Sequence, residues 1–155
     1  MPINFNEEEQ LVLEKIQSYC LYQERCLQEV KNKLLSLKIN VNSAEKIIKS
    51  LKENDYLNED RYVKLFIQGK LRIKKWGKIK LKNELRIRSI DKNIIEKYIN
   101  GISETDYLSY FNDFSRTKIE RLKGTQDQKK RSFINYFTYR GWENTLIYEK
   151  LKDIN

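Results

Sequence analysis

The sequence LKNELRIRSIDKNIIEKYINGI, residues 81–102, carries apolar side chains at spacings that predict two short helices joined by a turn. Steps of three or four residues keep apolar side chains on one face of a helix, whereas the two five-residue steps here require a turn. The apolar positions are Leu81, Leu85, Ile90, Ile95, Ile99 and Ile102. We therefore expect a helix pair with its turn at residues 88–91.

This spacing pattern recurs on both sides of residues 81–102, at offsets of 51 and 52 residues. The other two copies are Val30, Leu34, Ile39, Ala44, Ile48 and Leu51, and Phe133, Phe137, Trp142, Ile147, Leu151 and Ile154. Because the five-residue steps recur in register, the chain is predicted to contain an internal repeat. Leu34, Leu85 and Phe137 should then be buried at equivalent positions.

One further helix is expected before each pair, over residues 7–22, 59–74 and 104–122. The side chains expected to cap helix N-termini are Asn58, Asp91, Ser103, and Asn42 or Ser43. Gly141, in the third turn, suits the positive φ that often ends a helix.

The predicted fold class is all-α, built from three tandem three-helix repeats at residues 1–55, 56–102 and 103–155. A chain with five glycines and one proline has few residues that break helices. Since each repeat is too small to bury its own apolar face, neighbouring repeats should stack into an elongated, curved array.

The net charge of +9 is concentrated in two blocks of the sequence. Residues 61–90 hold eleven basic side chains and one acidic, and residues 116–140 hold eight basic and two acidic. Blocks of this density are typical of surfaces that bind a polyanion or an acidic protein groove. The alternative for both blocks is a solvated, lysine-rich surface without a partner.

A tryptophan lies inside the first block, next to a glycine that is expected to form a turn. Cationic side chains around an aromatic ring combine phosphate contact with base stacking, although Trp76 could equally be packed inside its turn. Equivalent positions in successive repeats should bring both blocks to one side. The residues predicted to form this binding surface are Arg72, Lys74, Lys75, Trp76, Lys78, Lys82, Arg86, Arg88, Arg116, Arg121, Lys130 and Arg131.

The sequence offers no residues for catalysis. It has no histidine, and its two cysteines, Cys20 and Cys26, cannot close a zinc site and are expected to be buried. There is no glycine-rich phosphate loop and no nucleophile–base pair. We therefore expect a protein without enzymatic activity, metal or cofactor. With no signal peptide or apolar span, we expect a cytoplasmic monomer without a membrane partner.

Four segments together resemble the RecX family. Residues 56–62, YLNEDRY, are similar to its Tyr-Leu-Asp-Asp-x-Arg-Phe element, and residues 23–30, QERCLQEV, resemble its Arg-x-Arg-Ser-x-x-Glu-Leu element. Gln23 and Cys26 depart from that second element. Residues 76–85 resemble the Gly-x-x-x-Ile stretch and following Glu-Leu of the family's second helix pair, and residues 140–142 resemble its Lys-Gly-Phe turn.

This resemblance implies a function that composition alone does not. RecX proteins bind the filament that RecA recombinase forms on single-stranded DNA, within its helical groove, and inhibit its ATPase and strand exchange. The chain is accordingly predicted to regulate RecA through its basic surface, with single-stranded DNA contacted directly or within the filament. The alternative is a helical protein that binds nucleic acid without sequence preference and has no recombinase partner.

Overall fold

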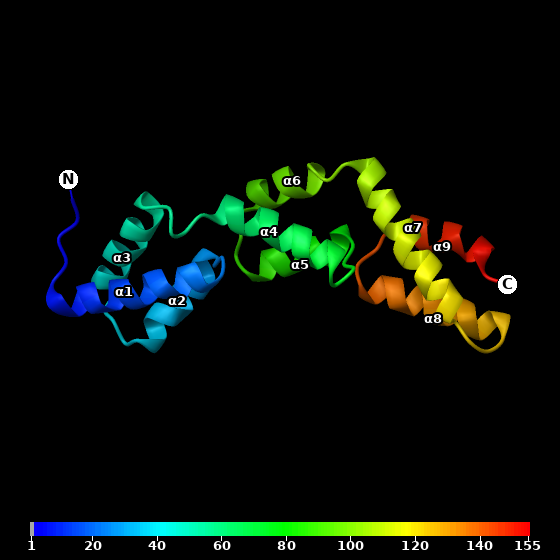
Figure 1. The fold of residues 1–155 in the computed structure, drawn as a ribbon, viewed down its shortest axis with the longest axis horizontal. Helices are drawn as coiled ribbons and strands as arrows, with labels where there is room; N and C mark the ends of the chain where they lie inside the picture. The colour runs from blue at the N-terminus through cyan, green and yellow to red at the C-terminus, as the bar shows by residue number, and fades with distance from the viewer. Residues whose placement is uncertain (1) are drawn as a thin grey trace. The chain divides into compact units, whose positions relative to one another are not determined.

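The computed structural model describes residues 2–155, and these form nine α-helices, a final 3-10 turn and no strand (Figure 1). The helices are α1 Glu7–Tyr22, α2 Leu27–Ser36, α3 Val41–Glu53, α4 Glu59–Arg72, α5 Lys78–Ile87, α6 Lys92–Asn100, α7 Glu104–Arg121, α8 Gln126–Tyr139 and α9 Asn144–Lys150. The prediction of an all-helical chain with three successive sets of three helices is confirmed.

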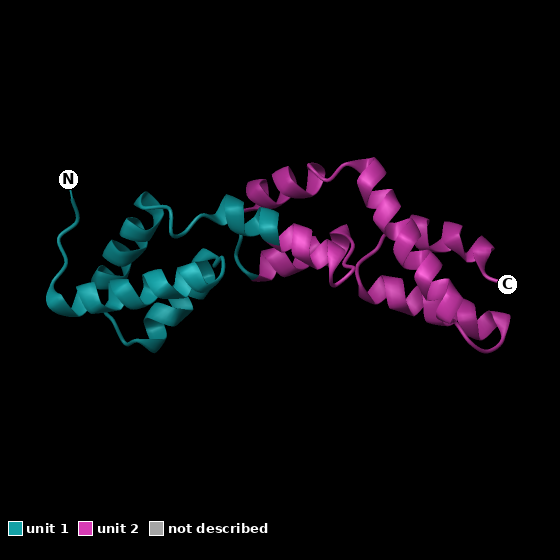
Figure 2. Cartoon of the chain, viewed as in Figure 1, with its two compact units in different colours: residues 1–65, 88–90 teal, residues 66–87, 91–155 magenta. Residues whose placement is uncertain are grey.

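Contacts between residues divide the helices into two compact units (Figure 2). Unit 1 comprises the chain up to Leu65 together with residues 88–90, and unit 2 comprises residues 66–87 and 91–155. Unit 1 therefore holds α1 to α3 and the start of α4, while unit 2 holds the remainder of α4 and α5 to α9. The repeat boundaries at residues 55 and 102 remain a prediction.

Unit 1 is built around aliphatic side chains from its first three helices. Ile16, Val30, Leu34, Ile47 and Leu51 are almost completely buried in one cluster. Ile48, which the repeat pattern placed in this core, is only partly buried, and its neighbour Ile47 takes the central place. Both cysteines are also buried, as expected.

The YLNEDRY segment closes unit 1 by packing and by ion pairing. Leu57 is buried in the cluster, and Tyr56 packs against it. Arg61 pairs with Glu24 and with Asp55, whose carboxylate lies 2.9 Å away. The segment therefore fixes the start of α4 against the helices that precede it.

The N-terminus of α3 differs from the prediction. Asn40, and not Asn42 or Ser43, caps the helix, since its side-chain oxygen accepts from the Ser43 amide at 2.8 Å. The Ser43 hydroxyl instead donates to the buried carboxylate of Glu9, 2.6 Å away. Lys46 also donates to Glu9, at 2.8 Å, and these hydrogen bonds lower the pKa of Glu9 to about 2. The network ties α1 to α3.

Aromatic side chains dominate the core of α7 to α9 in unit 2. Phe133, Phe137 and Trp142 are at most 1% exposed. The Trp142 ring stacks on Tyr107, with 4.6 Å between the ring centroids, and lies 5.1 Å from Phe111. These rings fill the space that shorter aliphatic side chains fill in unit 1.

The three turns that join the helix pairs each contain one residue with a positive φ. Lys38, Ser89 and Gly141 occupy corresponding positions, and their φ angles are 57°, 59° and 82°. Leu34, Leu85 and Phe137 are each at most 1% exposed, as the repeat predicts. The left-handed residue at each turn therefore confirms the register read from the apolar spacings.

Glycine at the second turn should stabilise the protein. A left-handed conformation costs a residue with a side chain about 1–2 kcal/mol, and the entropic cost of glycine offsets only part of that. We expect Ser89→Gly to raise the free energy of unfolding by about 0.5–1 kcal/mol in urea denaturation. Lys49→Gly, at an exposed site inside α3, should lower it by about 1 kcal/mol. A stability loss in Ser89→Gly would contradict the turn assignment.

Truncation of a repeat-core residue should be costly. Leu85→Ala removes a fully buried side chain and should lower the free energy of unfolding by about 2–5 kcal/mol. Ile87, on the same helix, is 72% exposed, so Ile87→Ala should change the stability by less than about 0.5 kcal/mol. Equal losses in the two variants would show that Leu85 is not a core position.

Candidate functional site

The positive charge of the protein belongs to one of its two units. Unit 2 carries 20 basic and 11 acidic side chains, whereas unit 1 carries 11 of each. The whole net charge of +9 therefore lies in unit 2, on α4 to α9 and their turns. Any attraction to a polyanion acts on this unit.

Two glycines bring the α4–α5 turn against the α8–α9 turn inside unit 2. The Gly77 amide donates to the Arg140 carbonyl at 2.8 Å, and the Ile79 amide donates to the Gly141 carbonyl at 3.0 Å. A Cβ atom on Gly77 would come within 2.5 Å of the Gly141 carbonyl oxygen, and one on Gly141 would overlap the backbone of Lys80. Only glycine permits this approach at both places.

Side chains complete the contact between these turns. The indole Nε1–H of Trp142 donates to the Lys75 carbonyl at 2.8 Å. The Tyr107 hydroxyl accepts from the Lys78 amide at 2.9 Å and donates to the Glu143 carboxylate at 2.6 Å. Burial, followed by the hydrogen bond to Glu143, raises the pKa of Tyr107 well above its ordinary value. The phenol therefore stays neutral and retains its proton for donation.

Two lysines where the α4–α5 turn meets the α8–α9 turn lie over aromatic rings of α7. Lys75 Nζ is 5.5 Å from the centroid of Phe114, and Lys78 Nζ is 4.5 Å from that of Tyr107. The side chains of both lysines are half-buried. These two predicted binding residues therefore also hold the α4–α5 turn on α7.

The Trp76 side chain is partly packed against its neighbours and partly exposed to solvent. It is half-buried, and its ring centroid lies 6.1 Å from that of Phe66. Lys70 and Lys80 place their ammonium groups 5.2 Å and 5.0 Å from the Trp76 centroid. Lys80 also lies 4.2 Å from the ring of Tyr139 on α8. A mixed cationic and aromatic surface therefore runs from the α4–α5 turn to the end of α8.

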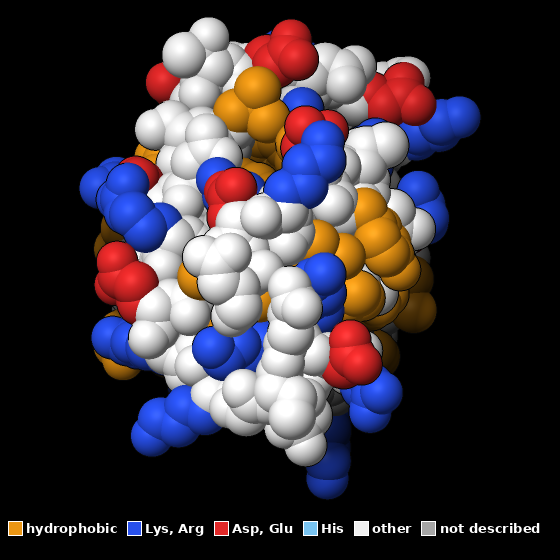
Figure 3. All heavy atoms as spheres, turned by 90° about the vertical axis from the view of Figure 1, so that its right-hand side faces the viewer, with side chains coloured by type: hydrophobic (Ala, Val, Ile, Leu, Met, Phe, Trp, Pro, Cys, Tyr) orange, Lys and Arg blue, Asp and Glu red, His pale blue; other side chains and the backbone are white. Residues whose placement is uncertain are grey.

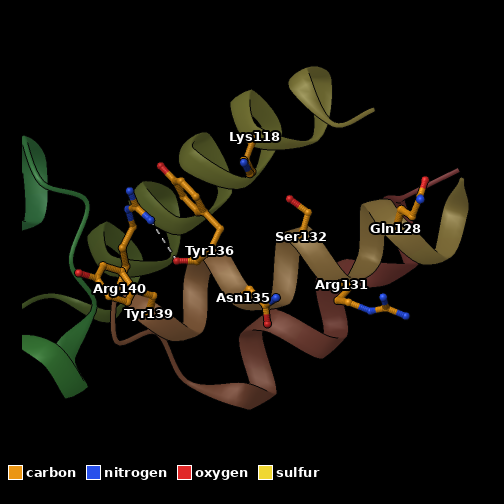
Figure 4. A pocket seen from close by; sticks show the side chains of 8 residues that line it. All are labelled: Lys118, Gln128, Arg131, Ser132, Asn135, Tyr136, Tyr139 and Arg140. Carbon is orange, nitrogen blue, oxygen red and sulfur yellow. Dashed lines mark hydrogen bonds between the residues drawn. The ribbon is translucent and has the colours of Figure 1, made fainter. Parts of the chain in front are cut away.

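A groove of about 570 Å³ lies next to this surface, between α7 and α8 (Figure 4). Arg140 lies at one end of its lining and Arg131 toward the other, and Lys118 projects from α7 over the middle. No acidic side chain lines it. Its lining consists of Lys118, Gln128, Arg131, Ser132, Asn135, Tyr136, Tyr139 and Arg140. We call this feature the α7–α8 groove.

The remaining predicted binding residues are spread over several elements. Arg72, Lys74, Arg86, Arg116 and Arg121 are spread over α4, α5, α7 and the turn after α4, and Lys82 and Lys130 are half-buried. Arg116 pairs with Asp113 on its own helix at 3.0 Å. The end view in Figure 3 shows Lys and Arg side chains distributed around the surface, with Asp and Glu between them.

One predicted residue falls outside unit 2. Arg88 belongs to unit 1, where burial raises the pKa of the Tyr62 phenol and the charge of Arg88 partly opposes that rise. Of the twelve predicted residues, only Arg131 lines the α7–α8 groove.

The predicted set omits seven of the eight residues that line the groove, among them Tyr136, Tyr139 and Arg140. Arg140 belongs to the second basic block of the sequence, but neither it nor the two tyrosines is among the predicted binding residues. A signal was present, because Tyr136 and Arg140 are four residues apart on one helical face. The guanidinium carbon of Arg140 indeed lies 3.6 Å from the Tyr136 centroid.

Within the described residues we find no cluster of three or more metal-binding side chains. No helix over residues 2–155 is long and apolar enough to cross a membrane.

Fold and surface together define a class: an all-helical protein of three-helix repeats with its positive charge gathered in one unit. The family domain described as "RecX, second three-helix domain" matches residues 58–99. Regulatory protein RecX of Clostridium acetobutylicum is 31% identical over 137 residues, and that of Prosthecochloris aestuarii is 24% identical over 136 residues. The chain is therefore similar to RecX proteins over most of its length.

The similarity covers different shares of these proteins. The match to the Clostridium protein spans 81% of this chain but 60% of that relative, while the Prosthecochloris match spans 88% of each. A crystal structure of regulatory protein RecX superposes with a TM-score of 0.82 at 16% identity, covering 95% of this chain and 74% of the other. RecX from Lactobacillus salivarius gives 0.81 at 19% identity, covering 96% and 97%. These superpositions establish the fold.

The contact between the two turns gives a sharp prediction about glycine. Gly141→Ala combines a φ of 82° with overlap of the Lys80 backbone, and should lower the free energy of unfolding by about 2–5 kcal/mol. Gly69 offers a matched control, because a Cβ there meets nothing within 4 Å. Gly69→Ala, inside α4, should raise the stability by about 1 kcal/mol. Thermal or urea denaturation of both variants measures the difference, and a neutral Gly141→Ala would refute the close contact.

Proposed function

We propose that this protein regulates RecA recombinase by binding the RecA–single-stranded-DNA filament through unit 2, thereby suppressing ATP hydrolysis and strand exchange. The observation that carries the proposal is the concentration of the entire net charge in that unit. The similarity to relatives that are named regulatory proteins supports the regulatory role. We further propose that the protein acts as a monomer in the cytoplasm and without a cofactor.

The electrostatics suit a partner that presents many negative charges. Arg72, Lys74 and Lys82 form no ion pair with any described residue, so their charges are uncompensated locally. Close packing of like charges destabilises a free protein, and a partner of opposite sign relieves that repulsion. Steering by such a field also speeds association, and the effect weakens as salt rises.

A second candidate function is binding of nucleic acid without a recombinase. The cationic and aromatic surface at Trp76, Lys80 and Tyr139 favours it, because stacking and phosphate contact need no protein partner. The two functions differ in one measurable respect. Only a RecA regulator inhibits RecA ATPase when it is present well below the concentration that covers the bare DNA.

Charge reversal tests the proposed surface. Lys75 and Lys78 are unsuitable targets because they rest on Phe114 and Tyr107. We therefore choose the exposed residues Arg72, Lys74 and Arg86, each changed to Glu. The triple variant should require at least about tenfold more protein for half-inhibition of RecA ATPase on single-stranded DNA, because reversal removes attraction and adds repulsion.

The matched control reverses three lysines on the surface of unit 1: Lys15, Lys49 and Lys52, each changed to Glu. It makes the same change in net charge and should leave inhibition within about twofold of the unaltered protein. Circular dichroism should show the same helix content in all three proteins. Equal loss of inhibition in both variants would show that the net charge of the protein, and not the surface of unit 2, determines inhibition.

A further inference from the structure

The α7–α8 groove has the composition of an anion site. Three of its eight lining side chains are cationic, three are neutral and polar, and two are tyrosines. Lys118, Arg131 and Arg140 form no ion pair with the described residues. The groove is shallow and open to solvent, which suits an extended strand. The groove therefore offers unneutralised positive charge in a concave place.

Two of these cations are held in position by one aromatic ring. The Arg140 guanidinium carbon lies 3.6 Å from the centroid of Tyr136, and Lys118 Nζ lies 4.5 Å from the same centroid. Arg140 also donates a hydrogen bond to the Tyr136 carbonyl at 3.3 Å (Figure 4). A guanidinium stacked in this way keeps its other N–H groups available, and less side-chain entropy is lost when an anion binds.

Neutral groups lie between the cations along α8. Ser132 and Asn135 occupy the stretch between Arg131 and Arg140 (Figure 4). The Gln128 side-chain oxygen is engaged by the Thr125 amide at 2.9 Å, so its NH₂ group remains as a donor. Hydroxyl and amide donors are common partners of phosphate and sugar oxygens. Cations and hydrogen-bond donors therefore follow one another along α8, so the groove offers several successive contacts to an anion and not one alone.

The end of the groove at the C-terminus of α8 presents an aromatic face. Tyr139 is 73% exposed, and two cations flank its ring: Lys80 at 4.2 Å and Arg140 at 6.0 Å from the centroid. Lys80 in turn contacts Trp76, so this face continues toward the α4–α5 turn within unit 2. An exposed ring beside cations is the arrangement on which unstacked bases lie while neighbouring phosphates are neutralised.

We propose that the α7–α8 groove binds a segment of single-stranded nucleic acid, with its phosphates on Arg140, Lys118 and Arg131 and a base stacked on Tyr139. The inference deepens the proposed function and rests on it, since it assigns to unit 2 a direct site for the strand. A duplex offers phosphates but keeps its bases stacked away from the ring. An acidic peptide would use the cations and leave the exposed face of Tyr139 without a partner.

The test uses the full chain without RecA and follows the fluorescence anisotropy of a labelled oligothymidylate. The groove variant carries Lys118→Gln, Arg131→Gln and Arg140→Gln. It should bind at least about tenfold more weakly, and the slope of log affinity against log salt should fall by about 2, because each neutralised phosphate contributes about 0.7 to that slope. A control with Lys64→Gln, Lys92→Gln and Lys152→Gln, exposed residues outside the groove, should keep both affinity and slope close to those of the unaltered protein.

Tyr139→Ala is the second variant, and its exposed position makes misfolding no explanation for a loss. It should weaken binding of the single strand about tenfold, leave binding of a duplex of the same length unchanged, and be rescued by Tyr139→Phe. Equal loss in the groove and control variants would overturn the proposal, as would full affinity in the groove variant. So would a Tyr139→Ala variant that binds the single strand normally, or stronger competition by polyglutamate than by unlabelled oligothymidylate.

RecA ATPase is measured on the same variants as a separate readout. Normal oligonucleotide binding by the unaltered protein without any inhibition of RecA would refute the proposed function and leave the groove intact. Inhibition of RecA by a groove variant that retains full oligonucleotide binding would refute the groove alone.

Discussion

The close approach of Gly77 and Gly141 is the constraint on which the arrangement of unit 2 depends. Two backbone hydrogen bonds, of 2.8 Å and 3.0 Å, join turns that are more than sixty residues apart in sequence. Neither could form if either glycine carried a Cβ atom. The indole N–H of Trp142 adds a further hydrogen bond between the two turns by donating to the Lys75 carbonyl. As a result, Lys80 lies between the rings of Trp76 and Tyr139, where the cationic surface and the α7–α8 groove meet.

The helical architecture could be predicted from sequence because it rests on local periodicity. Steps of three, four and five residues determine which side chains share a face, and the buried positions Leu34, Leu85 and Phe137 followed from them. The N-cap of α3 could not be chosen in this way. Three candidates lie within four residues, and Asn40 caps the helix because the hydroxyl of Ser43 is used by Glu9, which is distant in sequence.

The binding surface was also only partly predictable, because contacts between residues distant in sequence decide where its side chains lie. A count of charges along the chain identifies the basic blocks, and these fall largely in unit 2. It does not show that Lys75 and Lys78 are placed over aromatic rings of α7, or that Arg88 belongs to unit 1. Nor does it show that Tyr136 positions Arg140 and Lys118, which depends on how α7 packs against α8.

The central claim is that unit 2, and not unit 1, contacts the RecA–single-stranded-DNA filament. Hydroxyl-radical footprinting of exposed tyrosines measures this directly, because each unit has a highly exposed tyrosine: Tyr139 is 73% exposed in unit 2 and Tyr22 is 83% exposed in unit 1. Addition of filament should reduce the oxidation rate of Tyr139 several-fold and leave that of Tyr22 unchanged. Protection of Tyr22 with Tyr139 still fully reactive would contradict the account.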